Sequence, residues 1–172
     1  MRPMIRIRRL AAAGGVAGLL AALGVPGGGA GRAVAAGPVA AFPIVAAQTA
    51  ANGEMNYDGT IKGQLVITVP VGAAVQLTLT NKGTLPHSLQ IIPYTNQMPA
   101  AAVPTPAFPG AQTKDPQAGI TKGQTAVVQF TAGKAGRYLM ICGFPGHALL
   151  GMYGIFEVSP SAATKPTLVI KK

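Results

Sequence analysis

The residues of this sequence that could do chemistry are few, and three of them share one short segment. The only cysteine, Cys142, is followed after four residues by His147 and after four more by Met152, in the pattern C-x4-H-x4-M. The only other histidine is His87, far upstream. One thiolate, two imidazoles and a weak axial thioether form a trigonal site that suits copper cycling between its +1 and +2 states. We therefore expect these four residues to bind one copper ion. Zinc could occupy the same ligands, but the Irving–Williams order favours copper.

Taken singly, each of these residues has an ordinary structural explanation. A lone buried cysteine is usually a small inert hydrophobe. A single buried methionine most often fills the core, and a histidine on an apolar face is more often a hydrogen-bonded core residue than a ligand. The joint pattern is more specific, because it uses the only cysteine and both histidines of the chain, with Gly and Pro between them.

The segments around these residues have the patterns of short β-strands bounded by Gly, Pro and Asn turns. We expect strands over residues 65–69, 75–80, 87–91, 125–131, 136–141 and 153–158, with 167–170 as a short final strand or a free end. Alternation along residues 87–91 places His87, Leu89 and Ile91 on one buried face. No segment after the N-terminal region has a convincing 3.6-residue apolar period, so the expected fold is an all-β Greek-key β-sandwich or barrel.

Two loops are expected to complete the site. Cys142 closes one predicted strand and Met152 opens the next, so His147 lies at the tip of the loop between them. Glycines and Pro145 let this loop turn sharply, and His87 can approach it from across the sandwich. Residues 93–119 contain six prolines and no periodicity, which predicts a long loop over one end of the fold.

The N-terminal region has the order of a secretory signal: basic residues 1–9, an apolar stretch 10–25, and small residues at 33–35. We expect residues 1–35 to direct export to the periplasm or the extracytoplasmic face of a membrane. The apolar stretch is shorter than the roughly 20 residues that span a bilayer, so an uncleaved membrane anchor is the alternative. Arg8 and Arg9 also permit twin-arginine export.

The remaining chain divides by composition. We expect an Ala/Pro-rich linker or arm over residues 36–53, a domain over 54–158 and a C-terminal tail over 159–172. Without residues 1–35, nine basic and four acidic side chains remain, a net charge of about +5. The basic residues are scattered, which argues against nucleic-acid binding. So few carboxylates predict tolerance of acid, because acid unfolding comes largely from protonating paired carboxylates.

The ligand segment identifies a family. The sequence CGFPGHALLGM over residues 142–152, with Pro86-His87-Ser88 and the segment Asn56–Thr60 upstream, resembles the sulfocyanin and rusticyanin group of blue copper proteins. The resemblance covers roughly residues 54–158. It implies a cupredoxin fold, copper ligation by His87, Cys142, His147 and Met152, and electron transfer with a cytochrome or terminal oxidase. Many cupredoxins have Asn after the first histidine, with a backbone N–H that binds the cysteine sulfur, and Ser88 stands at that position here.

The expected surroundings of the site are apolar. Six residues are expected to ring His147 and to make its edge an electron port in a docking patch: Phe108, Phe144, Pro145, Ala148, Leu149 and Leu150. Phe144, Pro145 and Ser88 are the residues expected directly behind the ligands. The function that follows is single-electron transfer by a monomer.

Three other functions fit the sequence less well. Multicopper oxidases and copper nitrite reductases need further histidines for a second kind of copper centre, and both histidines are already used here, so we do not expect an enzyme. A copper carrier or storage protein could share the ligand set but would exchange copper quickly. A metal-free structural domain is disfavoured by the complete ligand set.

Overall fold

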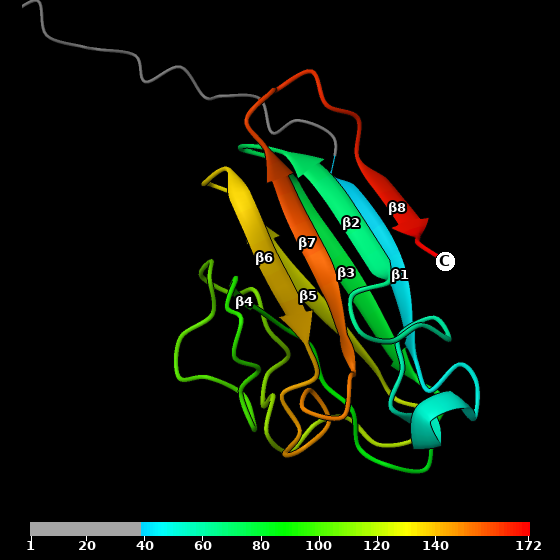
Figure 1. Ribbon diagram of the computed structural model, residues 1–172. Helices are drawn as coiled ribbons and strands as arrows, with labels where there is room; N and C mark the ends of the chain where they lie inside the picture. The colour runs from blue at the N-terminus through cyan, green and yellow to red at the C-terminus, as the bar shows by residue number, and fades with distance from the viewer. Residues whose placement is uncertain (1–38) are drawn as a thin grey trace, which may run out of the picture. The chain divides into compact units, whose positions relative to one another are not determined.

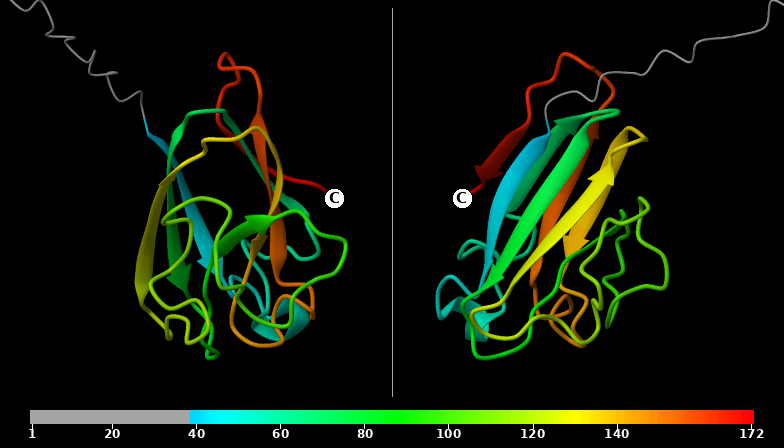
Figure 2. Two further views of the ribbon diagram at one scale, coloured as in Figure 1. Left: turned by 90° about the vertical axis from the view of Figure 1, so that its left-hand side faces the viewer. Right: turned by 180° about the vertical axis from the view of Figure 1, so that it is seen from behind.

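A computed structural model describes residues 39–172, in which eight strands form two sheets packed face to face (Figure 1). The view in the left panel of Figure 2 shows the two layers from their edge. The signal peptide predicted over residues 1–35, and the membrane anchor that is its alternative, lie outside the described residues. In the described part of the chain no helix is both long enough and apolar enough to cross a bilayer.

The smaller sheet has three strands in the order β1-β3-β5. Strand β3 is central and pairs in parallel with β1 and antiparallel with β5. Its residues alternate between buried and half-buried, as a strand with one face on the core requires. The bounds of the three strands are Ala40–Ala46, Ala74–Asn81 and Thr125–Thr131.

The larger sheet has five strands in the order β4-β6-β7-β2-β8. Strand β7 pairs in parallel with β2 and antiparallel with β6, so both sheets are mixed. The final strand β8 adds antiparallel to β2, which confirms the extra strand that the tail sequence allowed. The bounds are Gln90–Pro93, Gly136–Ile141, Tyr153–Ser159, Leu65–Pro70 and Thr167–Ile170.

The core has two parts because strand β6 is buried on both faces. Tyr138, Met140 and the following Cys142 join the main cluster between the sheets, whereas Leu139 and Ile141 join a second cluster on the opposite face. Residues of the long loop over 94–119, including Met98 and Val103, pack against this second cluster. The loop predicted from its prolines is therefore confirmed, and it covers the sheet face next to the ligand segment.

Strand β1 contradicts the linker expected over residues 36–53. Residues Ala40–Ala46 alternate between buried and exposed or half-buried positions and pair along their whole length with β3. Ala and Pro are poor strand formers, so the sequence hid this element. Pro43 is tolerated because β1 pairs on one side only, as an edge strand can. A 3-10 turn, η1 (Ala51–Glu54), follows β1.

Strand β4 is shorter than the predicted strand over residues 87–91. It begins at Gln90, and His87 makes only an isolated bridge with Ile120. His87, Leu89 and Ile91 are buried as expected, but Ser88 and Gln90 between them are buried too. The segment loses its alternation because the long loop covers the face that would otherwise meet water.

The role of β1 in the domain can be tested by core truncation. Ile44→Ala removes a fully buried side chain of β1, so we expect it to lower the free energy of unfolding by about 2–5 kcal/mol. Val127→Ala on β5 is the control, because that side chain is 57% exposed and its loss should change stability by about 0.5 kcal/mol or less. Denaturant unfolding of both variants in the same metal state is the measurement. Equal stabilities of the two would place β1 outside the cooperative fold.

Candidate metal centre

His87 is held at the end of the sandwich by its backbone. Its N–H donates to the carbonyl of Ile120 at 3.1 Å, and its own carbonyl accepts from the Ile120 N–H at 2.7 Å. The neighbouring Gly119 has a φ of +71°, and a Cβ there would stand 2.9 Å from the His87 carbonyl oxygen. A glycine is therefore required at this point, and it lets the long loop press His87 into place.

The segment from Cys142 to Met152 closes on itself between two paired strands. Cys142 directly follows β6 and Met152 directly precedes β7, and the Cys142 N–H donates to the Met152 carbonyl at 3.1 Å. The Met152 N–H in turn donates to the carbonyl of His147 at 3.0 Å, and the His147 N–H to that of Phe144 at 3.2 Å. These bonds fix the three candidate ligands of the segment relative to one another.

Glycine also joins the ligand segment to the long loop. A Cβ at Gly143 would stand 2.7 Å from the Cβ of Ala102 and 2.9 Å from the carbonyl oxygen of Pro116. The Gly143 carbonyl accepts from the Ala102 N–H at 2.9 Å, and the Gly146 N–H donates to the carbonyl of Ala100 at 2.7 Å. The glycines expected to let the segment turn thus also allow close packing against its cover.

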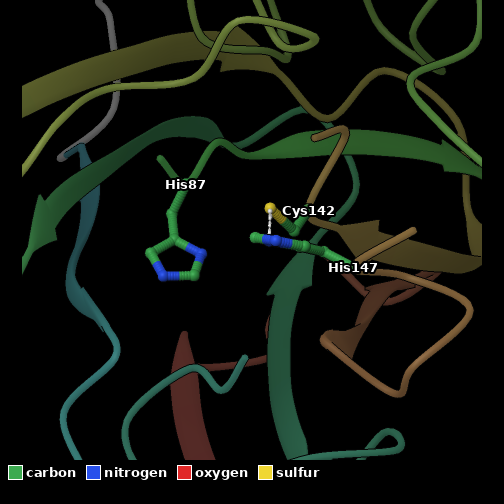
Figure 3. Close-up of side chains that lie close together, drawn as sticks. All are labelled: His87, Cys142 and His147. Atoms are coloured by element: carbon green, nitrogen blue, oxygen red, sulfur yellow. Dashed lines mark hydrogen bonds between the residues drawn. The ribbon is translucent and has the colours of Figure 1, made fainter. Parts of the chain in front are cut away.

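The structure brings the sequence-predicted residues together. One ligand atom from each of His87, Cys142 and His147 lies within 4.8 Å of the others, and Figure 3 shows His87 beside the two residues of the ligand segment. The Cys142 sulfur is 3.5 Å from His147 Nδ1, and the two imidazole rings are 5.0 Å apart. Met152 is fully buried and belongs to the same core cluster as Cys142.

The buried imidazole of His87 shows that this cluster fits a metal ion. Within the described residues, neither of its ring nitrogens has a hydrogen-bond partner, although the side chain is completely buried. Buried polar groups are almost always paired, and an orphan requires an explanation. A metal ion bound by one of the nitrogens would explain why the ring has no other partner. The thiol and the second imidazole are ligand types that copper prefers.

Ser88 connects the cysteine to the long loop. Its backbone N–H points at the Cys142 sulfur at 3.4 Å, the contact that the sequence resemblance implied for this position. Its hydroxyl donates to the Pro116 carbonyl at 2.6 Å and accepts from the Gly143 N–H at 2.8 Å. Three segments around the sulfur are thereby held by one side chain.

Burial controls the protonation of the metal-free site. Burial raises the pKa of the Cys142 thiol, while the backbone N–H groups of Ser88 and Phe144 oppose that rise. Burial, with the nearby His147, lowers the pKa of His87 from 6.5 to about 4, and burial also lowers the pKa of His147. Neutral imidazoles are the form that binds metals, whereas the thiol must release its proton on binding.

The apolar ring expected around His147 forms only in part. The Phe144 ring lies 4.7 Å from the His147 ring, and Pro145 is exposed beside it in the same loop. Leu149 and Leu150 are 57% and 55% exposed, so they do not pack inward, whereas Ala148 is buried. His147 itself is only 4% exposed.

Phe108 was wrongly expected in this ring. It is buried between the sheets, 4.8 Å from the Tyr138 ring and 5.5 Å from the Phe130 ring. It lies in the core because the long loop folds back at this point to fill the space between the layers.

Tyr57 has a structural role that its position in the sequence did not indicate. Tyr57 is almost fully buried, and its hydroxyl donates to the backbone carbonyl of Ser88. The neighbouring Asp58 accepts from the Val45 N–H at 2.8 Å, which ties this segment to β1. A phenylalanine at residue 57 could not donate this bond. The choice of tyrosine in the segment was therefore the one sign in the sequence that a buried acceptor lies nearby.

Comparisons with known proteins agree with this geometry. The sulfocyanin (SoxE) domain family matches residues 35–170. Sulfocyanin of Sulfolobus acidocaldarius is 30% identical over 143 residues, which cover 75% of this chain and 68% of that protein. The family match begins at residue 35, so it includes strand β1.

Solved structures share the fold. Auracyanin A, described as a "blue" copper protein from Chloroflexus aurantiacus, has a TM-score of 0.50 and 25% identity, with coverage of 71% of this chain and 100% of that one. A copper nitrite reductase from Nitrosomonas europaea has a TM-score of 0.51 and 25% identity. The match covers 74% of this chain and 44% of the reductase chain. The fold is therefore the all-β cupredoxin sandwich that the strand pattern predicted.

The lowered histidine pKa values predict a pH-dependent stability of the metal-free protein. Between about pH 6.5 and pH 4 the unfolded chain binds more protons than the folded one, so the free energy of unfolding falls as the pH drops. Each histidine contributes at most about 1.4 kcal/mol per pH unit. The carboxylates act in opposite directions, because hydrogen bonds from Thr84 lower the pKa of Glu54 while burial raises that of Asp58.

Denaturant unfolding of chelator-treated protein at several pH values is the measurement. The copper-loaded protein is the comparison, and its stability should fall at least as steeply over the same range, because the bound ion keeps the imidazoles and the thiolate free of the protons that the unfolded chain binds. A metal-free protein equally stable at pH 7 and pH 4 would contradict the prediction.

Proposed function

The chain belongs to the sulfocyanin family of blue copper proteins, and from that premise we propose that it is an exported carrier of single electrons. Its cofactor is one copper ion, which supplies a one-electron couple between the +1 and +2 states. The observation that best supports the proposal is the convergence of His87, Cys142 and His147 within 4.8 Å, with both ring nitrogens of His87 buried and unpaired.

In this proposal the four predicted residues are the ligands. The thiolate of Cys142 and the imidazoles of His87 and His147 would hold the ion, and the thioether of Met152 would be a fourth, weaker ligand. The Ser88 N–H at 3.4 Å from the sulfur stabilises the thiolate. Hydrogen bonds at a ligating sulfur tune the reduction potential.

Rigidity of the site favours rapid electron transfer. The ligand segment is closed by its own backbone bonds, and His87 is fixed to Ile120, so the ligands change position little when the charge of the ion changes. Little reorganisation is then needed for either oxidation state.

The electron port in this proposal is the edge of His147. Its ring is nearly covered, but Phe144 lies against it and the exposed Leu149 and Leu150 follow it in the chain. We refer to Leu149 and Leu150 as the leucine pair. Exposed apolar side chains next to a redox centre suit a docking surface, and the proposed partner is a cytochrome or terminal oxidase.

Catalysis is not part of the proposal. Both histidines of the chain are used by one ion, and the chain spans less than half of the nitrite reductase that shares its fold. Export to the periplasm or the outer face of a membrane, and a monomeric state, complete the proposal. Export rests on the residue order of the N-terminal segment.

A copper carrier is the second candidate, because its ligand set could be the same. The two functions differ in exchange rate, since a carrier must release copper readily while the closed ligand segment favours retention. Transfer of copper to a strong chelator, followed in both oxidation states, separates them. Release within seconds would favour the carrier.

Two ligand variants test the copper site. Cys142→Ser should abolish the intense thiolate-to-copper absorption band, because the hydroxyl cannot replace the thiolate as donor. Met152→Leu should keep that band and change the reduction potential, since it removes only the axial ligand. Absorption spectra and redox titration of copper-loaded protein are the measurements. A wild-type protein that binds copper but stays colourless would contradict the proposal.

The leucine pair can be tested without a known partner. Electron self-exchange between copies in the two oxidation states requires the centres to approach closely, so Leu150→Lys should slow it about tenfold or more, which is about 1.4 kcal/mol. Val127→Lys adds the same charge at an equally exposed position on β5 and is the control. Self-exchange is measured from NMR line broadening in mixed samples. Equal rates for both variants would place the port elsewhere.

A further inference from the structure

A carboxylate is fixed beside the His87 ring. Glu54, the last residue of η1, accepts two hydrogen bonds at its Oε2 atom, from the Thr84 N–H at 2.7 Å and from the Thr84 hydroxyl at 2.8 Å. Two bonds from one residue hold this oxygen in a single position, although Glu54 is only half-buried.

Gly83 shows how close this carboxylate lies to the imidazole. A Cβ at Gly83 would stand 3.0 Å from Glu54 Oε2 and 3.2 Å from His87 Nε2, and 2.5 Å from the Cβ of Ala47. The carboxylate oxygen and the ring nitrogen thus flank one small space that any side chain at residue 83 would fill. Glycine at this position leaves that space open between the carboxylate and the ring.

The orientation of the ring assigns its two nitrogens. In Figure 3 one nitrogen of His87 faces Cys142 and His147, and the other faces away from them. Because Nε2 is the atom beside Gly83 and Glu54, Nδ1 is the one left for the ion. Nε2 then carries the proton, and in metal sites such an N–H is donated to a carboxylate, a backbone carbonyl or water. Glu54 is the carboxylate beside it, although no hydrogen bond joins the two in the structure.

The backbone that presents Glu54 is strained. Asn52, Gly53 and Glu54 have φ values of 54°, 63° and 69°, so three consecutive residues adopt the left-handed conformation. Residues other than glycine rarely do so, and such outliers gather at functional sites. The turn is anchored by the Asn52 amide, which donates to the carbonyls of Met55 and Leu150 at 2.9 Å each. The strain is therefore maintained by contacts with the ligand segment itself.

We propose that Glu54 is a positioning residue for the copper centre, which orients His87 through its outer nitrogen and lowers the reduction potential. The inference rests on the proposed function. The negative charge stabilises the more highly charged Cu(II) state relative to Cu(I), so the copper accepts an electron from the redox partner less readily. The covered, largely apolar surroundings of the ligands favour Cu(I), and Glu54 opposes them from the His87 side.

The test compares two variants that each remove one carboxylate charge. Glu54→Gln keeps the shape of the side chain and should raise the reduction potential, and each tenfold loss of preference for Cu(II) over Cu(I) raises it by about 59 mV. Glu157→Gln on β7 is the matched control, because that carboxylate lies 3.9 Å from Arg137 and has no contact with the ligands. Equal potentials for the two variants, with the blue absorption intact, would overturn the inference.

A milder variant keeps the test decisive if Glu54→Gln fails to fold. Thr84→Val removes one of the two bonds to Oε2 and leaves the charge in place, so the potential should rise by less than in Glu54→Gln. The His87 Nε2 proton should also exchange faster with solvent in the Cu(I) protein, as NMR would show. No change in either quantity would refute the role of Glu54. A wild-type protein without a reversible copper couple would instead refute the proposed function.

Discussion

The buried imidazole of His87 is the constraint on which the rest of the site depends. An unpaired buried polar group costs about 1–3 kcal/mol, and within the described residues this ring has two of them. The ring cannot swing out to water, because its backbone is bonded on both sides to Ile120 and pressed by Gly119. The fold thus holds a metal-binding group in place before any metal arrives, and the unmet bond of the nitrogen that faces the other ligands contributes to affinity for the ion.

The other candidate ligands depend on the pairing of two strands. Because β6 and β7 are antiparallel neighbours, the residue after one and the residue before the other are brought together, and the Cys142–Met152 bond closes the segment. The turn within this segment then places His147 beside Cys142 and Met152. Ser88 then joins this segment to the strand that carries His87 and to the long loop. The Ser88 hydroxyl bonds both the long loop and the ligand segment, so a shift of either one would disturb the position of the sulfur.

The ligand segment was predictable because its spacing and strand-end positions are local properties. Strand β1 was not, since the three Ala and one Pro of AAFPIVA mask its strand formers, and its order comes from pairing with β3, far along the chain. Phe108 was misplaced for a related reason, because its position within a long loop does not predict where that loop folds back into the core. The partners of Ser88, Tyr57 and Glu54 come from segments that meet only in the folded chain.

The proposed docking surface and the proposed outer carboxylate meet at one point. The turn that presents Glu54 is bonded through Asn52 to the carbonyl of Leu150, so it lies at the margin of the leucine pair. A partner that covers the leucine pair therefore also displaces water near Glu54. Charges interact more strongly where water is excluded, and salt screens them less. The carboxylate then acts on the copper more strongly in the docked complex than in the free protein, which couples the electron affinity of the centre to the presence of its partner.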